Sequence, residues 1–396
     1  VALILVMFSL VDMGLYEFRT RRALQDNDGA ERIRLTQTGS LPVDALPDIY
    51  YIILDGYARA DILEELYNYD NSQFLESLEQ KGFFVADQSQ ANYVQTALSL
   101  ASALNLNYLD DLASRVGSEF GDRQPLQRMI KSSTVVQFLK QQGYVIVAFP
   151  TGYAPTSLDD ADVYMGSGPS WNPLEVLLLR NTPIPWLVAN QSQLNLYAPH
   201  IFKIRYMLEH LAETAQLQSP HFVFAHVVAP HPPFVFDEHG NETPQNREFS
   251  IEDGNRFLEM GGTREEYVDG YTGQLIFVND QIMAALDNLL ASQSSRPAIV
   301  ILQADHGPGL LLDWEHPENT YFRERVAILN AVHLPGGDSA GFYDEITPVN
   351  TFRLILNRYF GTELELLEDE SYFSLWDRPY DFIDVTEDVR SGVPPR

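Results

Sequence analysis

Residues 48–57 read Asp-Ile-Tyr-Tyr-Ile-Ile-Leu-Asp-Gly-Tyr, and this stretch decides the fold. Residues 49–54 form an unbroken apolar run that is rich in β-branched and aromatic side chains. Alternating apolar and polar residues would indicate a strand with one solvent-exposed face, whereas an unbroken apolar run predicts a strand buried on both faces. The run stops at Asp55 and Gly56, residue types that favour turns. The stretch therefore predicts a central strand that ends in a turn.

Similar apolar runs occur elsewhere in the chain. Apolar runs recur at 144–149, 222–228 and 298–302, and a less regular fifth run lies at 326–334. Helical periodicity separates the runs, at 62–83, 94–104, 135–142, 202–217 and 265–290. Strands that alternate with helices predict an α/β fold with a mostly parallel sheet and helices on both faces. The irregular stretches 151–200 and 231–262 are expected to be long insertions that form substrate loops.

The bulk composition excludes several classes of function. The 396 residues are 45% hydrophobic, which supports a large core, and they carry a formal net charge of −29. That charge argues against nucleic acid as a partner and against a broad basic membrane-binding face. It leaves room for an anionic substrate, because a bound cation can dominate the local field. The absence of cysteine excludes thiol catalysis, disulfides and cysteine-ligated zinc.

Polar side chains capable of binding a metal follow three of the predicted strands. Asp55 follows the first run, His231 follows the run at 222–228, and Asp305-His306 follows the run at 298–302. Sites in open α/β sheets form beyond the carboxyl ends of the strands, so these side chains are expected to meet. Gly307 permits a sharp turn after Asp305-His306, which would let both side chains bind one divalent cation. The alternatives are a turn aspartate with an exposed histidine, and for Asp55 a simple turn or helix cap.

Thr96 adds a hydroxyl to this set. Residues 92–100 read as an irregular entry into an apolar helix, with Thr96 in its first turn. Free backbone N–H groups and the helix dipole favour anions at that place, and a metal at the hydroxyl would activate it as a nucleophile. The alternative is an ordinary helix cap. Ser99 competes for the nucleophile role but lies about one turn deeper in the helix.

Three histidines need separate interpretations. His231 sits in a proline-stiffened loop, Ala-Pro-His-Pro-Pro-Phe at 229–234, and could bind the substrate anion or protonate a leaving group. His226 lies within a strand pattern and is expected to be a satisfied core histidine. His316 lies in the segment after the Asp305 motif. It could line the pocket, but a position outside the pocket is the favoured interpretation.

The motifs in this order resemble the alkaline phosphatase superfamily. Within it the chain resembles the sulfatase-like branch that includes lipoteichoic acid synthases and phosphoethanolamine transferases. The resemblance covers residues 46–370 and rests on the strings Leu-Asp-Gly-Tyr at 54–57, Asn-Tyr-Val-Gln-Thr at 92–96, Ala-Asp-His-Gly-Pro at 304–308 and Ile-Leu-Asn-Ala at 328–331. It implies an alkaline-phosphatase-like three-layer sandwich with a mostly parallel central sheet and helices on both faces.

The resemblance also implies roles for individual residues. One divalent metal ion would be held by Asp55, Thr96, Asp305 and His306. Thr96 would also be the nucleophile that forms a covalent phospho- or sulfo-enzyme, and His231 would contact the transferred group. Three oxygen ligands and one imidazole favour Zn²⁺ or Mn²⁺, with Mg²⁺ or Ca²⁺ as alternatives.

Departures from the family pattern narrow the chemistry. The chain has no Cys/Ser-x-Pro-x-Arg motif for formylglycine, so an ordinary sulfatase is not expected. It also lacks the Asp-x-x-x-His pair of two-metal relatives, which favours one metal. The transferase relatives often have glutamate where this chain has Asp55, which leaves the substrate subgroup open.

The predicted function is a metal-dependent phosphoester, or sulfate-ester, hydrolase or transferase. One alternative is a phosphoglycerol- or phosphoethanolamine-type transferase that acts on envelope lipid or glycan, and another is a catalytically silent binding domain. The expected substrate is a small or lipid- or glycan-linked anionic ester. Residues 1–18 are interpreted as the end of a membrane-anchoring helix with the catalytic domain outside the cytoplasm. Residues 19–45 are expected to be a linker, 46–370 the catalytic domain and 371–396 a C-terminal extension.

Overall fold

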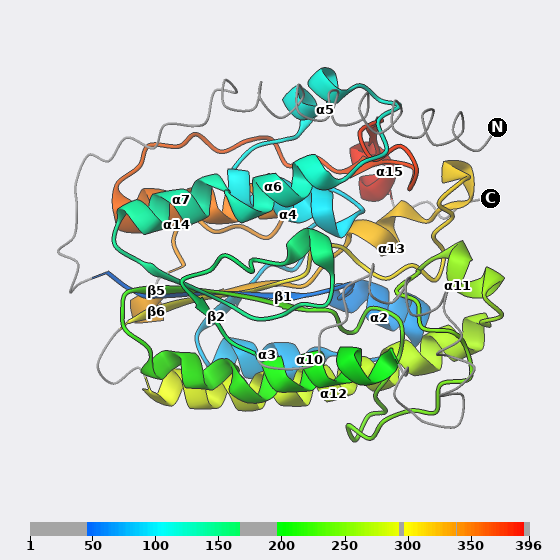
Figure 1. Ribbon diagram of the computed structural model, residues 1–396, viewed down its shortest axis with the longest axis horizontal. Helices are drawn as coiled ribbons and strands as arrows, with labels where there is room; N and C mark the ends of the chain where they lie inside the picture. The colour runs from blue at the N-terminus through cyan, green and yellow to red at the C-terminus, as the bar shows by residue number, and fades with distance from the viewer. Residues whose placement is uncertain (1–45, 167–195, 293–296, 338, 392–396) are drawn as a thin grey trace, which may run out of the picture.

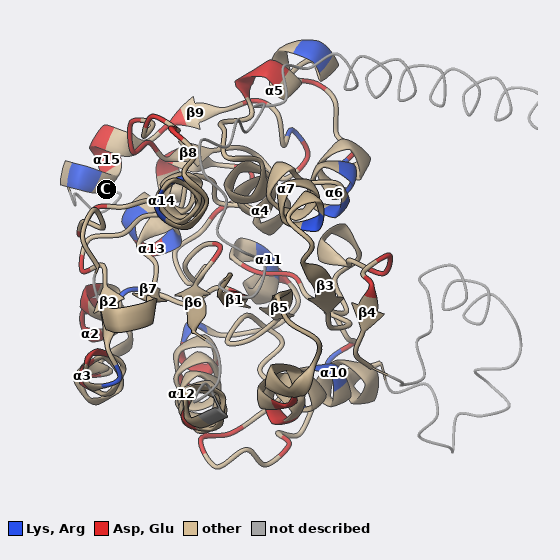
Figure 2. Ribbon diagram, turned by 90° about the vertical axis from the view of Figure 1, so that its left-hand side faces the viewer, with Lys and Arg blue, Asp and Glu red and all other residues tan. Residues whose placement is uncertain are grey.

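The computed structural model describes residues 46–166, 196–292, 297–337 and 339–391. The predicted N-terminal helix and linker, and most of the predicted insertion at 151–200, lie outside these ranges. Helices cover both faces of one central sheet, so the described chain forms three layers (Figures 1 and 2). This confirms the α/β class and the three-layer arrangement.

Within the described ranges the main sheet has seven strands. In order across the sheet they are β2 (Phe83–Val85), β7 (Asn330–His333), β6 (Ala298–Gln303), β1 (Asp48–Leu54), β5 (His221–Val227), β3 (Val145–Ala148) and β4 (Val163–Tyr164). β1 pairs in parallel with β5 and β6, and only β7 runs antiparallel to its neighbours. The central position of β1 explains its unbroken apolar sequence, because both of its faces are covered.

The two helical layers bury opposite faces of β1. One layer contains α4 (Thr96–Asn105), α5 (Asp110–Val116), α6 (Gln124–Lys131), α7 (Thr134–Gln141) and α14 (Pro348–Phe360). The other contains α2 (Ala60–Tyr67), α3 (Ser72–Gln80), α10 (Tyr197–His210) and α12 (Arg264–Ser292). Ile49, Tyr51 and Ile53 pack towards the first layer, while Tyr50, Ile52 and Leu54 pack towards the second. The alternation of strand side chains thus divides the core into two halves around β1.

Smaller elements close the edges of the molecule. They are α11 (Asn255–Glu259), α13 (Phe322–Val326), α15 (Thr386–Ser391), β8 (Tyr372–Phe373) and β9 (Ile383–Asp384). Short 3₁₀ helices occupy Ala154–Thr156, Leu211–Gln216, Pro317–Asn319 and Pro335–Gly337. The C-terminal segment packs against the entry to α4, where Tyr372 N donates to Asn92 O at 2.9 Å and Gln95 Nε2 donates to Ser374 O at 3.2 Å.

Several sequence-based element assignments need correction. The run at 326–334 is a strand only over Asn330–His333, because residues 322–326 form α13. Within the predicted insertion at 151–200, residues 154–156 form a 3₁₀ helix and Tyr197 already begins α10. α6 and α14 were not predicted, since charged and polar residues interrupt their apolar faces.

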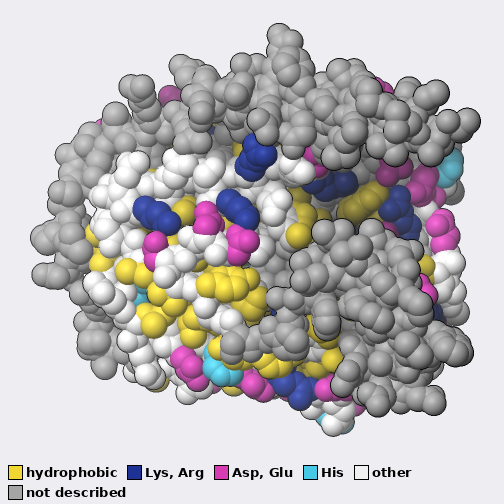
Figure 3. All heavy atoms as spheres, in the orientation of Figure 1, with side chains coloured by type: hydrophobic (Ala, Val, Ile, Leu, Met, Phe, Trp, Pro, Cys, Tyr) yellow, Lys and Arg dark blue, Asp and Glu magenta, His cyan; other side chains and the backbone are white. Residues whose placement is uncertain are grey.

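The described surface carries charges of both signs. On the described part of the face seen in Figure 3, basic and acidic side chains lie next to each other. Among the described residues, Lys140 and Asp162 form an ion pair of 3.5 Å. None of the helices in the described ranges is long and apolar enough to cross a membrane.

Candidate active site

The carboxyl ends of the central strands and the start of α4 meet at one edge of the sheet. Asp55 directly follows β1, Asp305 and His306 follow β6, and Thr96 is the first residue of α4. All four side chains are buried, with exposed fractions between 1% and 8%. The structure therefore brings together the four residues predicted as metal ligands, although they are separated by up to 251 positions in the chain.

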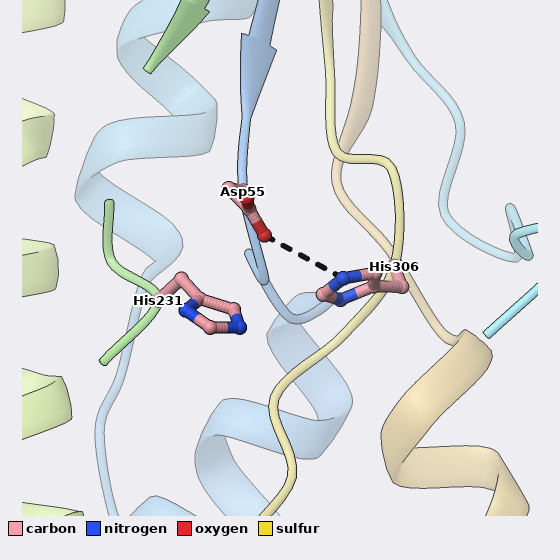
Figure 4. A group of neighbouring side chains, drawn as sticks. All are labelled: Asp55, His231 and His306. Atoms are coloured by element: carbon pink, nitrogen blue, oxygen red, sulfur yellow. Dashed lines mark ion pairs between the residues drawn. The ribbon is translucent and has the colours of Figure 1, made fainter. Parts of the chain in front are cut away.

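The ligand atoms of these residues surround His306 Nε2. This nitrogen lies 3.0 Å from Thr96 Oγ1, 3.4 Å from Asp305 Oδ2 and 3.5 Å from Asp55 Oδ1. Figure 4 shows Asp55 and His306 pointing towards each other, with His231 beside them. Ligand bonds of about 2.0–2.2 Å in a tetrahedron place neighbouring ligand atoms about 3.3–3.6 Å apart. The three separations therefore suit a single small divalent ion.

The protonation states also suit a cation. His306 Nδ1 lies 2.9 Å from the carbonyl of Gly307, which can only accept, so Nδ1 carries the hydrogen and the Nε2 lone pair faces the cluster. Burial, and then the charge of Arg325, lower the pKa of His306 and keep the imidazole neutral. Burial acts to raise the pKa of Asp55, but His231, His226 and His306 outweigh it and hold the pKa below its usual value. Metal binding needs a neutral histidine and an ionised carboxylate, which are the forms favoured here.

Two buried carboxylate oxygens lack partners. Asp55 Oδ1 and Asp305 Oδ2 accept no hydrogen bond, although Asp305 Oδ1 accepts one from Gly56 N at 3.2 Å. An unsatisfied buried acceptor costs about 1–3 kcal/mol, and more when it is charged. The nearby Arg325 guanidinium is bound to Asp253 at 2.7 Å instead. The donor set of this cluster therefore fits a divalent cation, which would neutralise both carboxylates.

His231 lies next to Asp55 and lines the same pocket. Its backbone N donates to Asp55 O at 3.0 Å, and its Nδ1 lies 2.6 Å from Pro232 O. Its Nε2 lies 3.7 Å from Asp253 Oδ2, and its ring centroid lies 6.0 Å from that of His306. Ligand atoms of Asp55, His231 and His306 lie within 4.8 Å of one another. The loop thus holds His231 at the position from which it could contact a transferred group.

His226 differs from its predicted role. Its Nδ1 lies 2.9 Å from Thr156 Oγ1, but its Nε2 lies 3.2 Å from Asp55 Oδ2 without forming a hydrogen bond. His226 is therefore only half satisfied, and it belongs to the cluster through Asp55 and Asp305. The strand pattern predicted burial correctly, but alternation alone could not show that this side chain points towards the end of β1.

The ion pair between Asp253 and Arg325 is a part of the site that sequence reasoning missed. Asp253 accepts hydrogen bonds from Tyr267 Oη at 2.7 Å and from Gly254 N at 2.8 Å. Arg325 donates to the carbonyls of Val94 and Gly307 at 3.0 and 2.9 Å, and its Nη2 lies 3.3 Å from His306 Nε2. The sequence offered one indication of this role: Arg325 is among the charged residues that directly precede the apolar residues 326–329.

Gly307 is required for a reason other than the predicted turn. Its backbone does not adopt a positive φ, but a Cβ at this position would lie 2.1 Å from Glu324 O. The Gly307 N–H also donates to Arg325 O at 2.7 Å. The glycine therefore allows the Asp305-His306 segment to pack directly against the backbone of α13.

A pocket of about 240 Å³ opens onto this cluster. Its floor contains Asp55, Thr96 and His306, and its wall is lined by Gln95, Tyr153, Ile251, Glu252, Trp314 and Trp376, among others. His316 does not line it, because the side chain is exposed and pairs with Glu318 at 3.4 Å. Ser99 is buried within α4 and also lies outside the pocket lining, so Thr96 is the accessible hydroxyl of the two.

Comparisons with known proteins agree with this fold and cluster. The sequence model of the Sulfatase family matches residues 47–352, so the chain belongs to the Sulfatase family. It is a sulfatase-like hydrolase or transferase of the alkaline phosphatase superfamily, as the motifs predicted. A comparison with curated protein sequences found no match.

Two solved structures share the fold at low sequence identity. The C-terminal periplasmic domain of EcEptC from Escherichia coli, in complex with Zn, matches with a TM-score of 0.53 and 12% identity, over 89% of this chain and 95% of that chain. BT1596, a 2-O GAG sulfatase, matches with a TM-score of 0.51 and 14% identity, over 81% of this chain and 72% of that chain. The fold thus occurs both in a zinc-bound periplasmic domain and in a sulfatase.

Proposed function

We propose that this chain is a metal-dependent phosphoester hydrolase or transferase in which Thr96 is the nucleophile. The observation that carries the proposal is the position of Thr96 Oγ1, at the start of α4 and 3.0 Å from His306 Nε2. The unsatisfied oxygens of Asp55 and Asp305 complete the metal-ligand set. The zinc complex of the EcEptC domain supports Zn²⁺ as the first ion to test.

The residues of the pocket can divide the reaction among them. A bound divalent cation would lower the pKa of the Thr96 hydroxyl, so that its proton leaves to solvent, and would offset charge on the phosphoryl oxygens. Thr96 Oγ1 then attacks phosphorus in line with the leaving oxygen, and an Oγ–P bond replaces the P–O bond that breaks. The first N–H groups of α4 and the helix dipole favour the anionic phosphoryl group at this place.

His231 is proposed to complete the proton transfers. In its doubly protonated form His231 passes the Nε2 proton to the departing oxygen, while its Nδ1–H, with Nδ1 2.6 Å from Pro232 O, holds the ring in position. In the second step His231 takes a proton back from water, or from an acceptor alcohol, as that oxygen attacks phosphorus. The new P–O bond replaces the Oγ–P bond, and Thr96 Oγ1 leaves and regains its proton from solvent. Water gives a hydrolase and an alcohol gives a transferase, and the same residues serve both outcomes.

Phosphate esters are preferred over sulfate esters as substrates. The chain contains no cysteine, and residues 96–100 lack the proline and arginine of a formylglycine motif, so family membership does not imply formylglycine chemistry. A phosphoethanolamine-type transferase is the more specific candidate, since phosphoethanolamine transferases share this branch. We also propose an extracytoplasmic location, by analogy with the periplasmic EcEptC domain.

The test combines metal analysis with a panel of substrates. Purified protein should retain close to one divalent metal per chain and hydrolyse bis(p-nitrophenyl) phosphate faster than p-nitrophenyl phosphate or p-nitrophenyl sulfate. Thr96→Ala should lose turnover by about 10⁴-fold or more, the scale at which a missing covalent nucleophile acts, while Thr96→Ser retains part of it. A Thr96→Ala protein with near-wild-type turnover would refute the nucleophile. Wild-type protein without metal would favour the silent binding domain.

A further inference from the structure

The loop after β3 holds a tyrosine in the pocket wall. Thr151 Oγ1 accepts a hydrogen bond from Tyr153 N at 3.1 Å and donates to Tyr153 O at 3.0 Å. Thr156 Oγ1 lies 3.2 Å from the same carbonyl, at the end of the short 3₁₀ helix Ala154–Thr156. Both threonines are buried. The backbone of Tyr153 is therefore fixed by two side chains rather than left free as in an ordinary surface loop.

The same loop is connected to the floor of the pocket. Thr156 Oγ1 lies 2.9 Å from His226 Nδ1, and His226 Nε2 lies 3.2 Å from Asp55 Oδ2. A continuous series of polar contacts thus runs from the backbone of Tyr153 to one of the proposed metal ligands. This arrangement fixes the backbone of Tyr153 relative to the floor of the pocket.

The hydroxyl of Tyr153 has no hydrogen-bond partner among the described residues. The side chain lines the pocket together with Thr96 and His231, and it makes no hydrogen bond to any residue in the described parts of the chain. Burial raises its pKa, Arg123 lowers it, and the carboxylates of Asp55 and Asp305 raise it further, to about 12. The phenol is therefore protonated at neutral pH and acts as a hydrogen-bond donor.

Three other donors around the pocket are engaged within the described protein. Arg325 donates to Asp253 and to the carbonyls of Val94 and Gly307. Trp314 Nε1 donates to Asp253 O at 3.2 Å, and the Gln95 amide donates to Ser374 and Leu375. The phenol of Tyr153 can therefore bind an incoming acceptor without breaking a hydrogen bond within the described protein.

We propose that Tyr153 is a substrate-binding residue whose phenol donates a hydrogen bond to a non-bridging oxygen of the phosphoryl group that Thr96 attacks. The proposal rests on the function proposed above and adds a residue that the metal-ligand motifs do not contain. A neutral donor in the pocket wall stabilises charge on the phosphoryl oxygens without adding a charge of its own.

Tyr153→Phe tests this role, because it keeps the ring and removes only the hydroxyl. With bis(p-nitrophenyl) phosphate as substrate, kcat/KM should fall by about 10- to 100-fold, which is the scale of one lost donor to a charged oxygen. The Kd of inorganic phosphate, measured by calorimetry on the metal-loaded protein, should rise by about tenfold on the same grounds. Metal content and Tm should stay unchanged. Tyr164→Phe is the matched control, since Tyr164 is 38% exposed and does not line the pocket.

Each outcome separates this proposal from the proposed function. Wild-type kinetics and phosphate affinity in Tyr153→Phe would overturn the role of the phenol and leave Thr96 chemistry standing. A loss of metal in Tyr153→Phe would make the residue a structural support, which also overturns the proposal. If wild-type protein hydrolyses no ester, the proposed function fails, and the phosphate titrations still decide whether Tyr153 binds the anion. Wild-type protein that neither hydrolyses the ester nor binds phosphate contradicts both.

Discussion

The floor and the wall of the pocket are built in different ways. The floor residues Asp55, Thr96 and His306, and Asp305 beside them, lie at strand ends or at a helix start and are at most 8% exposed. Most of the wall residues come from separate connecting segments, at Tyr153, at residues 251–252, at Trp314 and at Trp376. Strand ends and a helix start therefore hold the candidate metal ligands, while loops form most of the remaining pocket lining. Changes in the floor should affect metal and turnover, and changes in the wall should affect substrate binding.

Of the substitutions considered, Asp305→Asn should have the largest effect on metal affinity and turnover. A small effect would contradict the assignment of separate roles to floor and wall. Removing one charge from the Asp55–Asp305 pair should lower metal affinity by more than about 100-fold, beyond the cost of changing an outer-shell partner, and turnover should fall with it. The metal-free variant should have a higher Tm than metal-free wild type, because the repulsion between two buried carboxylates is relieved. Dialysis followed by elemental analysis, and thermal melts with and without Zn²⁺, measure both effects.

The control for this change is Asp269→Asn, on the exposed face of α12. It removes the same charge far from the floor and should leave metal content, turnover and Tm at wild-type values. An Asp305→Asn protein that keeps its metal through dialysis would show that Asp305 is not a ligand.

Gly307→Ala should give the next largest effect, this time on stability. The new Cβ would lie 2.1 Å from Glu324 O, so the backbone of the Asp305-His306 segment must move. Overpacking of this kind costs about 1–3 kcal/mol or more, and the shift should also weaken metal binding. Gly273→Ala is the contrast, because its Cβ would meet atoms no closer than 3.5 Å and it lies within α12. That variant should be slightly more stable, by up to about 1 kcal/mol. Denaturant unfolding of both variants decides the point.

Trp376→Leu tests whether the wall of the pocket affects substrate binding independently of the metal. Arg123 lies 4.1 Å from the Trp376 ring centroid and donates to Trp376 O, so the indole is held firmly in the pocket lining. Losing this surface should raise KM for the phosphodiester about tenfold, the scale of a lost apolar pocket contact, with kcat and metal content little changed. A Trp376→Leu protein that lost its metal instead would show that wall and floor are not separable.

The same division explains what the sequence could predict. Asp55, Asp305 and His306 were found because each follows an unbroken apolar run, and parallel strands place such ends together. Thr96 was found because the start of a helix has a recognisable pattern. These signals are local, and the sheet topology then makes the residues neighbours.

The wall and the supporting groups gave no such signal. Asp253 and Trp376 reach the pocket through long-range packing, and no period of 2 or 3.6 residues indicates where a loop will fold back. His226 illustrates the limit within a strand, since its burial was predicted but its contact with Asp55 depends on the register between β1 and β5. Gly307 was predicted to be needed for a sharp turn. The structure gives another reason, because the backbone of Glu324 in α13, 17 positions further along the chain, approaches it closely.

The smallest expected effect concerns the pH at which the floor releases its metal. Burial and Arg325 lower the pKa of His306, so protons compete with the metal only below the ordinary histidine pKa of about 6.5. Between the two pKa values the unfolded chain binds more protons than the folded one, so the metal-free protein should lose stability as the pH falls through this range. Arg325→Met should move metal release towards neutral pH by up to about one unit, because a neighbouring charge shifts a pKa by about that much, whereas Trp376→Leu should leave the release pH unchanged. Zinc occupancy measured against a chelator from pH 8 to pH 4 tests this, and wild-type release already at pH 7 would mean that neutral His306 does not bind the ion.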